Sequence, residues 1–309
     1  MIQFLLIIFG TLLLIVQKFI CPLPPNVQFL AFFVGIVLLG VPHGAADLLV
    51  ATKNDEGKPF SKFKFLAIYI GRLMLFSLTL WFFPLIGNLI FITIAAYHFG
   101  ETDLHKFKTN TLLGKLFVTS YGLLILSVIL INHFEEVRPI FEMFKSGEKN
   151  ILFINWIDEN RKLIMSSSGI FFFTSTFVYF LRNIKVEEKD KGEFLIQFGC
   201  LIILLYSMPM VLGFSFYFIL WHSVISLRNI VKYLRLGNTN PISVIIKQIS
   251  LYSFLAIAGI GIFGYSAFKY MSNNNAMAGY IFLGLAVLTA PHMEVMHNMY
   301  NKIRTIKTP

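Results

Sequence analysis

Five of the seven histidines in this chain lie within long apolar segments, where an ionisable side chain is costly and usually faces a partner or a cavity. They are His43, His98, His222, His292 and His297. Imidazole is a preferred ligand of iron, copper and zinc. The two cysteines, Cys21 and Cys200, show no metal-binding spacing, which argues against a thiolate site. We therefore predict that several of these histidines share a metal site.

Two carboxylates stand beside these histidines at helical spacing. Asp47 follows His43 by four residues and Glu101 follows His98 by three, so each pair shares one face of a helix. A carboxylate in this position accepts the second N–H of a ligating imidazole and fixes its tautomer, or binds the metal itself. We expect Asp47 and Glu101 to support the metal ligands in one of these ways.

The number of metal ions stays open in the sequence. His292 and His297 are five residues apart, about 140° around a helix, so one ion is not expected to bind both. Several carboxylates in the same segments would permit a second ion. These are Asp47, Glu101, Asp103 and Glu294.

The elements that must position these residues are membrane-spanning helices. The chain has 309 residues, of which 56% are hydrophobic and only 14% are charged. A globular protein carries about a quarter charged residues, whereas the apolar runs here reach the length of about 20 residues that a helix needs to cross a bilayer. We predict an all-α, multi-pass bundle of about ten transmembrane helices, forming a single domain over residues 1–309. The expected helices are 2–19, 27–50, 64–83, 86–104, 112–132, 163–182, 194–209, 212–235, 248–270 and 277–300.

Lysine and arginine are distributed unequally between the two sides of this bundle. Most of them lie in the connections after even-numbered spans and in the C-terminal segment. Because basic residues are retained on the cytoplasmic side, we predict that both termini are cytoplasmic and that the protein resides in the cell (inner) membrane. This distribution explains the net charge of +10 by membrane topology, so we do not expect a nucleic-acid partner. The five histidines all lie in even-numbered spans, so we expect them at similar depth.

One long connection, residues 133–162, is predicted to be extracytoplasmic. It mixes charges with Phe141, Phe144, Phe153 and Trp156, which favours an amphipathic lid lying on the bilayer surface.

Helix-breaking residues accompany two of the histidines. Pro42 and Gly44 flank His43, and Gly100 lies two residues after His98. Such breaks are tolerated within a membrane where the backbone is buried in protein or lines a cavity. We therefore expect the helices to be loosened beside these two histidines.

Aromatic residues and methionines crowd the same helices, so a cavity lined by them would favour a long apolar substrate. Tyr217 and Trp221 precede His222 and are candidates for lining this cavity. A redox metal in such a pocket points to oxygen chemistry on a lipid.

Four short motifs extend this interpretation. They are GVPHGAADLL at 40–49, YHFGETD at 97–103, LWHS at 220–223 and TAPH at 289–292. In this order they resemble the signatures of the Brp/Blh family of membrane-bound β-carotene dioxygenases, over about residues 30–300. PHGAAD is the most specific of them, and the last two are short and weak when taken alone.

The resemblance implies an iron(II) centre that cleaves the central double bond of β-carotene or a related carotenoid with O2 to give two retinal molecules. Its partners would be an apolar carotenoid from the bilayer and O2. Transferred to this chain, it assigns metal ligands at His43, His98, His222 and His292, with His297 as the alternate. The first three would be catalytic, and Asp47 and Glu101 would support them. One ion is expected, and a second stays open.

One position departs from the family pattern. A second histidine often follows the WHS histidine by four residues, whereas this chain has Ser226 there. Serine is a poor iron ligand, so the fourth ligand position falls to His292 or His297 or stays open. The departure also leaves open a substrate other than β-carotene.

Three alternatives remain at this point. A membrane desaturase or hydroxylase usually carries HxxH boxes, and none occurs here. A transporter would use intramembrane histidines and carboxylates for proton relay and would not need iron. A non-catalytic protein that binds carotenoid or retinal would hold pigment without consuming O2.

Overall fold

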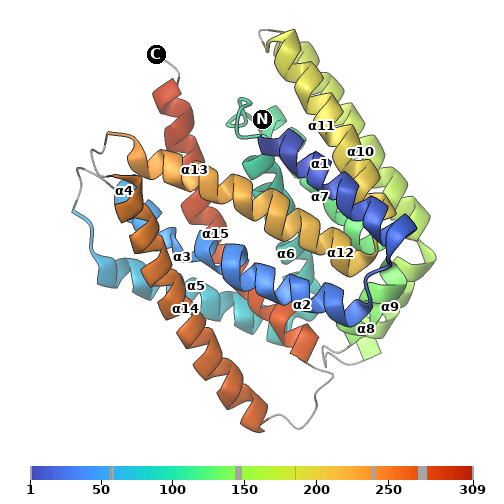
Figure 1. Cartoon of the computed structure of the whole chain (residues 1–309), viewed down its shortest axis with the longest axis horizontal. Coiled ribbons are helices and arrows are strands. Elements are labelled where there is room, and N and C mark those ends of the chain that lie inside the picture. Colours follow the sequence, from blue (N-terminus) through green and yellow to red (C-terminus); the bar gives the residue numbers. More distant parts are fainter. Residues whose placement is uncertain are drawn as a thin grey trace.

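The computed structural model of the chain is a bundle of helices joined by short connections (Figure 1). It describes residues 2–55, 57, 59–142, 148–184, 186–237, 241–270 and 277–307, and these contain no β-strand. The prediction of an all-α fold is confirmed. The start of α1 (Ile2–Ile15) and the end of α15 (Met277–Lys307) both lie toward the upper edge of Figure 1.

Each of the ten predicted segments coincides with a helical rod, although four of them, 64–83, 86–104, 112–132 and 194–209, run one or two residues past its C-terminal end. Several rods contain a π-helical part, labelled η. The first five rods are α1 with η1 (Val16–Ile20), α2 (Pro25–Gly35) with η2 (Ile36–Gly40), α3 (Val41–Ala45) and α4 (Asp47–Asn54), α5 (Lys62–Phe82), α6 (Pro84–Asp103), and α7 (Leu112–Leu126) with η3 (Ser127–Ile131). The last five are α10 (Arg161–Arg182), α11 (Glu188–Ser207), α12 (Met210–Ser215) with η4 (Phe216–Ser223) and α13 (Val224–Arg235), α14 (Ile242–Tyr270), and α15.

Seven helical rods among the described residues are long and apolar enough to cross a membrane. This is the pattern of a multi-pass membrane protein. The rods outside this set are α6, α11 and α15, and each carries polar or charged residues near one end. The count of about ten spans and the cytoplasmic side of the termini therefore stay predictions.

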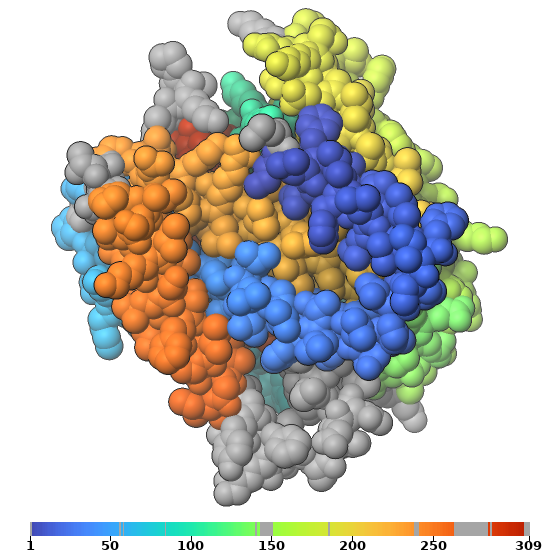
Figure 2. All heavy atoms as spheres, in the orientation of Figure 1, coloured from blue at the N-terminus to red at the C-terminus, as the bar shows by residue number. Residues whose placement is uncertain are grey.

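Burial separates central rods from peripheral ones. In their most apolar windows, 67% of the residues are buried for α7–η3 and 61% for α12–α13, against 6% for α1 and for α5. Figure 2 shows α1, α2 and α14 outermost on one face of the molecule, with many apolar side chains exposed. These outer side chains suit contact with lipid, whereas the central rods are surrounded by protein, and one of them carries His222.

Two glycines allow α6 and α7 to approach each other closely. A Cβ atom on Gly100 would lie 2.1 Å from the carbonyl oxygen of Val118, and one on Gly122 would lie 1.9 Å from that of Ala96. Small residues are typical of helix contacts in membranes, where association depends on close packing. The prediction that Gly100 loosens the helix is therefore wrong, because α6 runs unbroken past it and the packing requires its lack of a side chain.

The helix beside His43 is interrupted, as predicted. The π-helical η2 precedes α3, and α3 ends at Ala45, where Ala46 joins it to α4 with ψ of −6°. Pro42 has no N–H and its ring crowds the preceding turn, and the wider π-helical turn before it accommodates this. The rod is thus interrupted within one turn of a candidate ligand.

The long connection 133–162 is a pair of short helices, α8 (Phe134–Glu142) and α9 (Glu148–Glu159). Apolar side chains from both helices, including Phe134 and Ile157, form a small separate core. The guanidinium of Arg138 donates to Asp158 over 2.7 Å and ties the pair together. Phe144 lies outside the described residues, and the placement of this pair on a bilayer surface stays a prediction.

Candidate metal centre

Four histidines from four different rods meet in the interior of the bundle. They are His43 on α3, His98 on α6, His222 on η4 and His292 on α15, and none is more than 6% exposed. Neighbouring ring centroids are 4.9 Å apart for His43 and His292, and 5.0 Å for His292 and His98. The ring centroids of His98 and His222 are 4.8 Å apart, and those of His222 and His43 are 5.4 Å apart. We call this arrangement the histidine ring.

Nitrogen atoms of three members of the histidine ring are close enough to share one ion. One ring nitrogen from each of His43, His98 and His222 lies within 4.8 Å of the others. Two imidazole nitrogens bound to the same ion at roughly 2.1 Å stand at most about 4.2 Å apart, so small side-chain rotations suffice. Within the part of the chain that the structure describes, no other group of three or more His, Cys, Asp or Glu side chains has this spacing.

Most ring nitrogens of the histidine ring have no hydrogen-bond partner. They are Nδ1 of His43, both nitrogens of His98, both nitrogens of His222 and Nε2 of His292. A buried polar atom without a partner costs roughly 1–3 kcal/mol, and such atoms are rare in proteins. A metal ion bound to one nitrogen of each imidazole would remove part of this cost. The residues therefore fit a metal, and a purely imidazole set suits iron, copper or zinc.

Asp47 contacts the histidine ring through His292. Its Oδ1 lies 2.7 Å from Nδ1 of His292, and its Oδ2 accepts a hydrogen bond of 2.9 Å from the hydroxyl of Tyr69 on α5. This contact places the proton of His292 on Nδ1 and leaves the Nε2 lone pair for a metal. The expected pairing of Asp47 with His43 is not observed, because the helix break at Ala46 falls between them.

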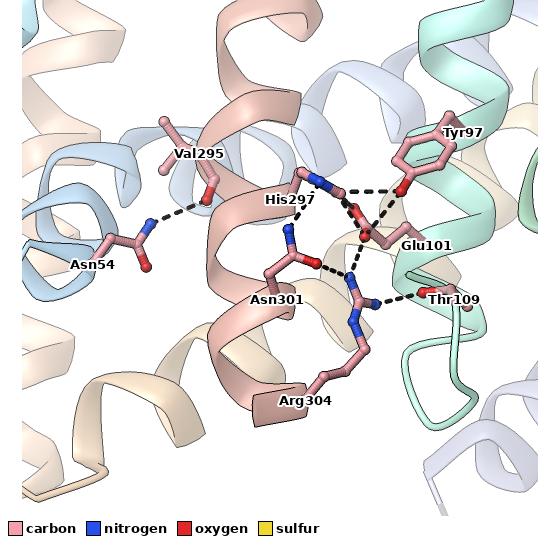
Figure 3. Close-up of polar contacts among 8 residues, drawn as sticks. All are labelled: Asn54, Tyr97, Glu101, Thr109, Val295, His297, Asn301 and Arg304. Carbon is pink, nitrogen blue, oxygen red and sulfur yellow. Dashed lines mark hydrogen bonds and ion pairs between the residues drawn. The ribbon is translucent and has the colours of Figure 1, made fainter. Parts of the chain in front are cut away.

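Glu101 is fully buried and also pairs with α15. Its Oε1 lies 2.9 Å from Nδ1 of His297 and accepts a hydrogen bond of 2.8 Å from Nη2 of Arg304. Figure 3 shows these groups facing each other between two helices, with Tyr97 beside them. The expected contact with His98 is not made, since neither nitrogen of His98 has a partner and Arg304 offers Glu101 a charged one.

His297 lies outside the histidine ring. Its Nδ1 contacts Glu101, its Nε2 lies 2.9 Å from the amide nitrogen of Asn301, and its side chain is 30% exposed. With both nitrogens engaged, it is a poor alternate ligand. The structure brings His292 into the ring instead, as the 140° separation of the two residues around the helix allows only one of them to do so.

Asp103 holds the two aromatic residues that were expected to line a substrate cavity. Its Oδ2 accepts hydrogen bonds from the hydroxyl of Tyr217 and from Nε1 of Trp221, both over 3.1 Å, and from the hydroxyl of Tyr121 over 2.9 Å. All four side chains are buried. The polar atoms of Tyr217 and Trp221 therefore point at a carboxylate, and a role of these rings in binding substrate stays a prediction.

The four carboxylates considered for a second ion do not converge. Glu294 forms an ion pair with Arg72 and is 43% exposed, while the other three have the separate partners described above. The structure thus brings together one candidate metal site among the described residues.

Several residues of the site were missed in the sequence. The ring centroids of Phe99 and His222 are 4.8 Å apart. Phe218 stacks on His222 with 6.1 Å between ring centroids and 16° between ring planes. Phe218 precedes His222 by four residues, a spacing that could have indicated a shared face. Tyr69 gave no local signal, because it meets Asp47 from another helix.

Comparison with known proteins bears on what this centre does. A sequence profile of a protein family described as β-carotene 15,15′-dioxygenase matches residues 34–300. The chain belongs to the β-carotene 15,15′-dioxygenase family. It is therefore an enzyme of the carotenoid-cleaving oxidoreductase class, and the resemblance seen in the motifs is confirmed. The matched region contains all four members of the histidine ring.

A curated relative agrees with this assignment. The protein named β-carotene 15,15′-dioxygenase from uncultured marine bacterium 66A03 is 25% identical to the chain over 260 residues, which cover 84% of the chain and 89% of the relative. No solved structure matches the chain.

Proposed function

We propose that this member of the β-carotene 15,15′-dioxygenase family cleaves the central double bond of β-carotene, or of a related carotenoid, with O2 to give two molecules of retinal. The observation that supports the proposal best is the histidine ring, which lies buried among apolar helices inside the region that matches the family. An oxygen-dependent reaction on an apolar polyene needs a redox metal in such surroundings.

The metal in this proposal is one iron(II) ion held by His43, His98, His222 and His292. Imidazole nitrogens suit iron, and the carboxylates that might have held a second ion are engaged elsewhere. Iron(II) bound there would supply the activation of O2 toward the conjugated double bond.

The surrounding residues prepare the site in two ways. Asp47 orients His292 and fixes its tautomer, which leaves the Nε2 lone pair for the metal. Phe99 and Phe218 cover His222 with apolar rings, which keep water away from the centre and suit a polyene chain as neighbour.

The remaining parts of the proposal concern location and partners. We propose that residues 1–309 form one multi-pass domain in the cell (inner) membrane. The carotenoid would enter sideways from the bilayer, because the outer helices expose apolar side chains to it. O2 is the second substrate.

The first test measures metal and product in the same preparations. The full chain is purified in detergent, its iron is measured by elemental mass spectrometry, and retinal formation from β-carotene with O2 is followed by chromatography. We expect about one iron ion per chain and retinal formation in the parent, and neither in the His43→Ala, His98→Ala double variant. The control is His133→Ala, which removes a half-buried histidine that pairs with Glu136 at the long connection.

The outcomes separate the alternatives. Iron retained in the double variant would show that the site is misassigned. A parent that binds β-carotene but neither consumes O2 nor forms retinal after anaerobic iron loading would be a pigment-binding protein. Substrate movement that depends on a proton gradient, without bound iron, would indicate a transporter.

A further inference from the structure

A buried carboxylate beside the histidine ring has no role in the proposal so far. Asp103 is the last residue of α6, only 8% of it is exposed, and its Oδ2 accepts three hydrogen bonds. One donor, Tyr121, lies on α7. The other two, Tyr217 and Trp221, lie on η4, and Trp221 directly precedes His222. A single oxygen therefore ties α6 and α7 to the segment that carries a candidate ligand.

The segment η4 needs such support. It is π-helical over eight residues, from Phe216 to Ser223, whereas π-helical turns are rare and usually occur as single turns at functional sites. A return to α-helical bonding would lower the number of residues in each turn by about one. It would thereby rotate His222 by about 100° about the helix axis. The direction of the His222 side chain thus depends on the π-helical form of η4.

The donors to Asp103 are placed to hold this form. Tyr217 and Trp221 are the second and sixth residues of η4, and both donate to the same oxygen atom over 3.1 Å. Hydrogen bonds to a carboxylate are roughly twice as strong as bonds between neutral groups. A third contact comes from Phe99, which packs against both Tyr217 and His222 at ring distances of 5.3 and 4.8 Å.

We propose that Asp103 is a positioning residue of the metal centre, which holds Tyr217 and Trp221, fixes the rotation of η4, and so directs His222 toward the other three histidines. The inference rests on the metal centre proposed above and not on the identity of the carotenoid. It differs from a general packing role, in which Asp103 would only join α6 to α7 through Tyr121.

The chain offers a matched pair of variants that separates these roles. Tyr121→Phe and Tyr217→Phe each remove one hydroxyl that donates to the same oxygen of Asp103, and both rings are buried. Only Tyr217 belongs to η4. Co(II) is the probe, because its visible absorption reports the ligand geometry and its titration gives a dissociation constant without any turnover.

We expect Tyr217→Phe to shift the Co(II) absorption and to weaken binding by roughly three- to ten-fold, since it acts on a ligand through one intermediate residue. Tyr121→Phe should leave the spectrum unchanged and the dissociation constant within about two-fold. Asp103→Leu, which removes all three acceptor contacts, should weaken binding by about 10–100-fold, and Asp103→Asn should restore part of it because its carbonyl oxygen still accepts.

The result that would overturn the inference is equal behaviour of the two tyrosine variants, whether both change the Co(II) spectrum or neither does. Size-exclusion chromatography and circular dichroism establish that each variant is folded. Should Asp103→Leu fail to fold, the two tyrosine variants decide the question alone. Absence of Co(II) binding by the parent would instead overturn the metal centre itself, and this inference with it.

Discussion

Replacing Asp47 by asparagine is expected to weaken metal binding while leaving the protein folded. The carboxylate joins Nδ1 of His292, at 2.7 Å, to the hydroxyl of Tyr69, at 2.9 Å. An asparagine side chain has one acceptor oxygen and one NH2 group. If the oxygen accepts from Tyr69, the NH2 group faces Nδ1, and the proton of His292 must move to Nε2. That tautomer places a proton on Nε2, the nitrogen proposed to bind the metal.

The size of the effect follows from this geometry. Loss of a carboxylate that orients a ligating histidine typically costs 10–100-fold in metal affinity. This corresponds to about 1.4–2.8 kcal/mol. The asparagine side chain can still fill the space of the aspartate, and Tyr69 keeps an acceptor, so the free energy of unfolding should change less than the affinity.

The assay is a titration of the detergent-purified variant with Co(II), read from its visible spectrum. The matched control is His297→Ala, which removes the second carboxylate–imidazole pair on α15, that of His297 with Glu101. His297 is partly exposed and Glu101 keeps Arg304 as partner, so this variant should fold and bind Co(II) like the parent. Parent-like affinity in Asp47→Asn, or an equal loss in His297→Ala, would refute the assignment of His292 to the metal.

Two further predictions concern a close helix contact and a buried hydroxyl. Gly122→Ala should destabilise the protein by at least the upper end of the roughly 1–3 kcal/mol typical of overpacking, because its Cβ would lie 1.9 Å from the carbonyl oxygen of Ala96. The control is Gly199→Ala, where an added Cβ meets nothing within 4 Å. Thermal stability in detergent is the measurement. Ser226→Ala should leave both stability and Co(II) affinity near those of the parent, because the buried Ser226 hydroxyl has no hydrogen-bond partner; a marked loss of affinity would show that this hydroxyl takes part in the metal site.

The membership of the histidine ring could largely be predicted from the sequence. Histidines are rare enough in apolar segments to be informative, and the parallel direction of the even-numbered segments suggested that they would meet. Helical geometry also indicated that only one of His292 and His297 could join. The choice of His292 came from the family resemblance, and the structure places its ring beside those of His43 and His98.

The partners of the carboxylates could not be predicted in the same way. The spacing argument for His43 and Asp47 holds only within a continuous helix. The helix breaks at Ala46, between these two residues, so the argument fails for Asp47. Glu101 meets His297, which is 196 residues away along the chain, and no short-range pattern reports such a contact. Gly100 shows the same limit, because a glycine that breaks a helix and one that permits close packing look alike until the neighbouring helix is known.

The contact between Asp47 and His292 spans 245 residues of the chain, and α15 follows all the other described helices. During synthesis, earlier segments emerge and assemble before later ones. His43, His98 and His222 would therefore be inserted well before the fourth member of their ring and the residue that Asp47 orients. Until α15 packs against the earlier helices, Asp47 has no imidazole to hold and the ring lacks one side. Loading of the proposed metal centre would then belong to the last stage of biogenesis, after the other three histidines have already been enclosed.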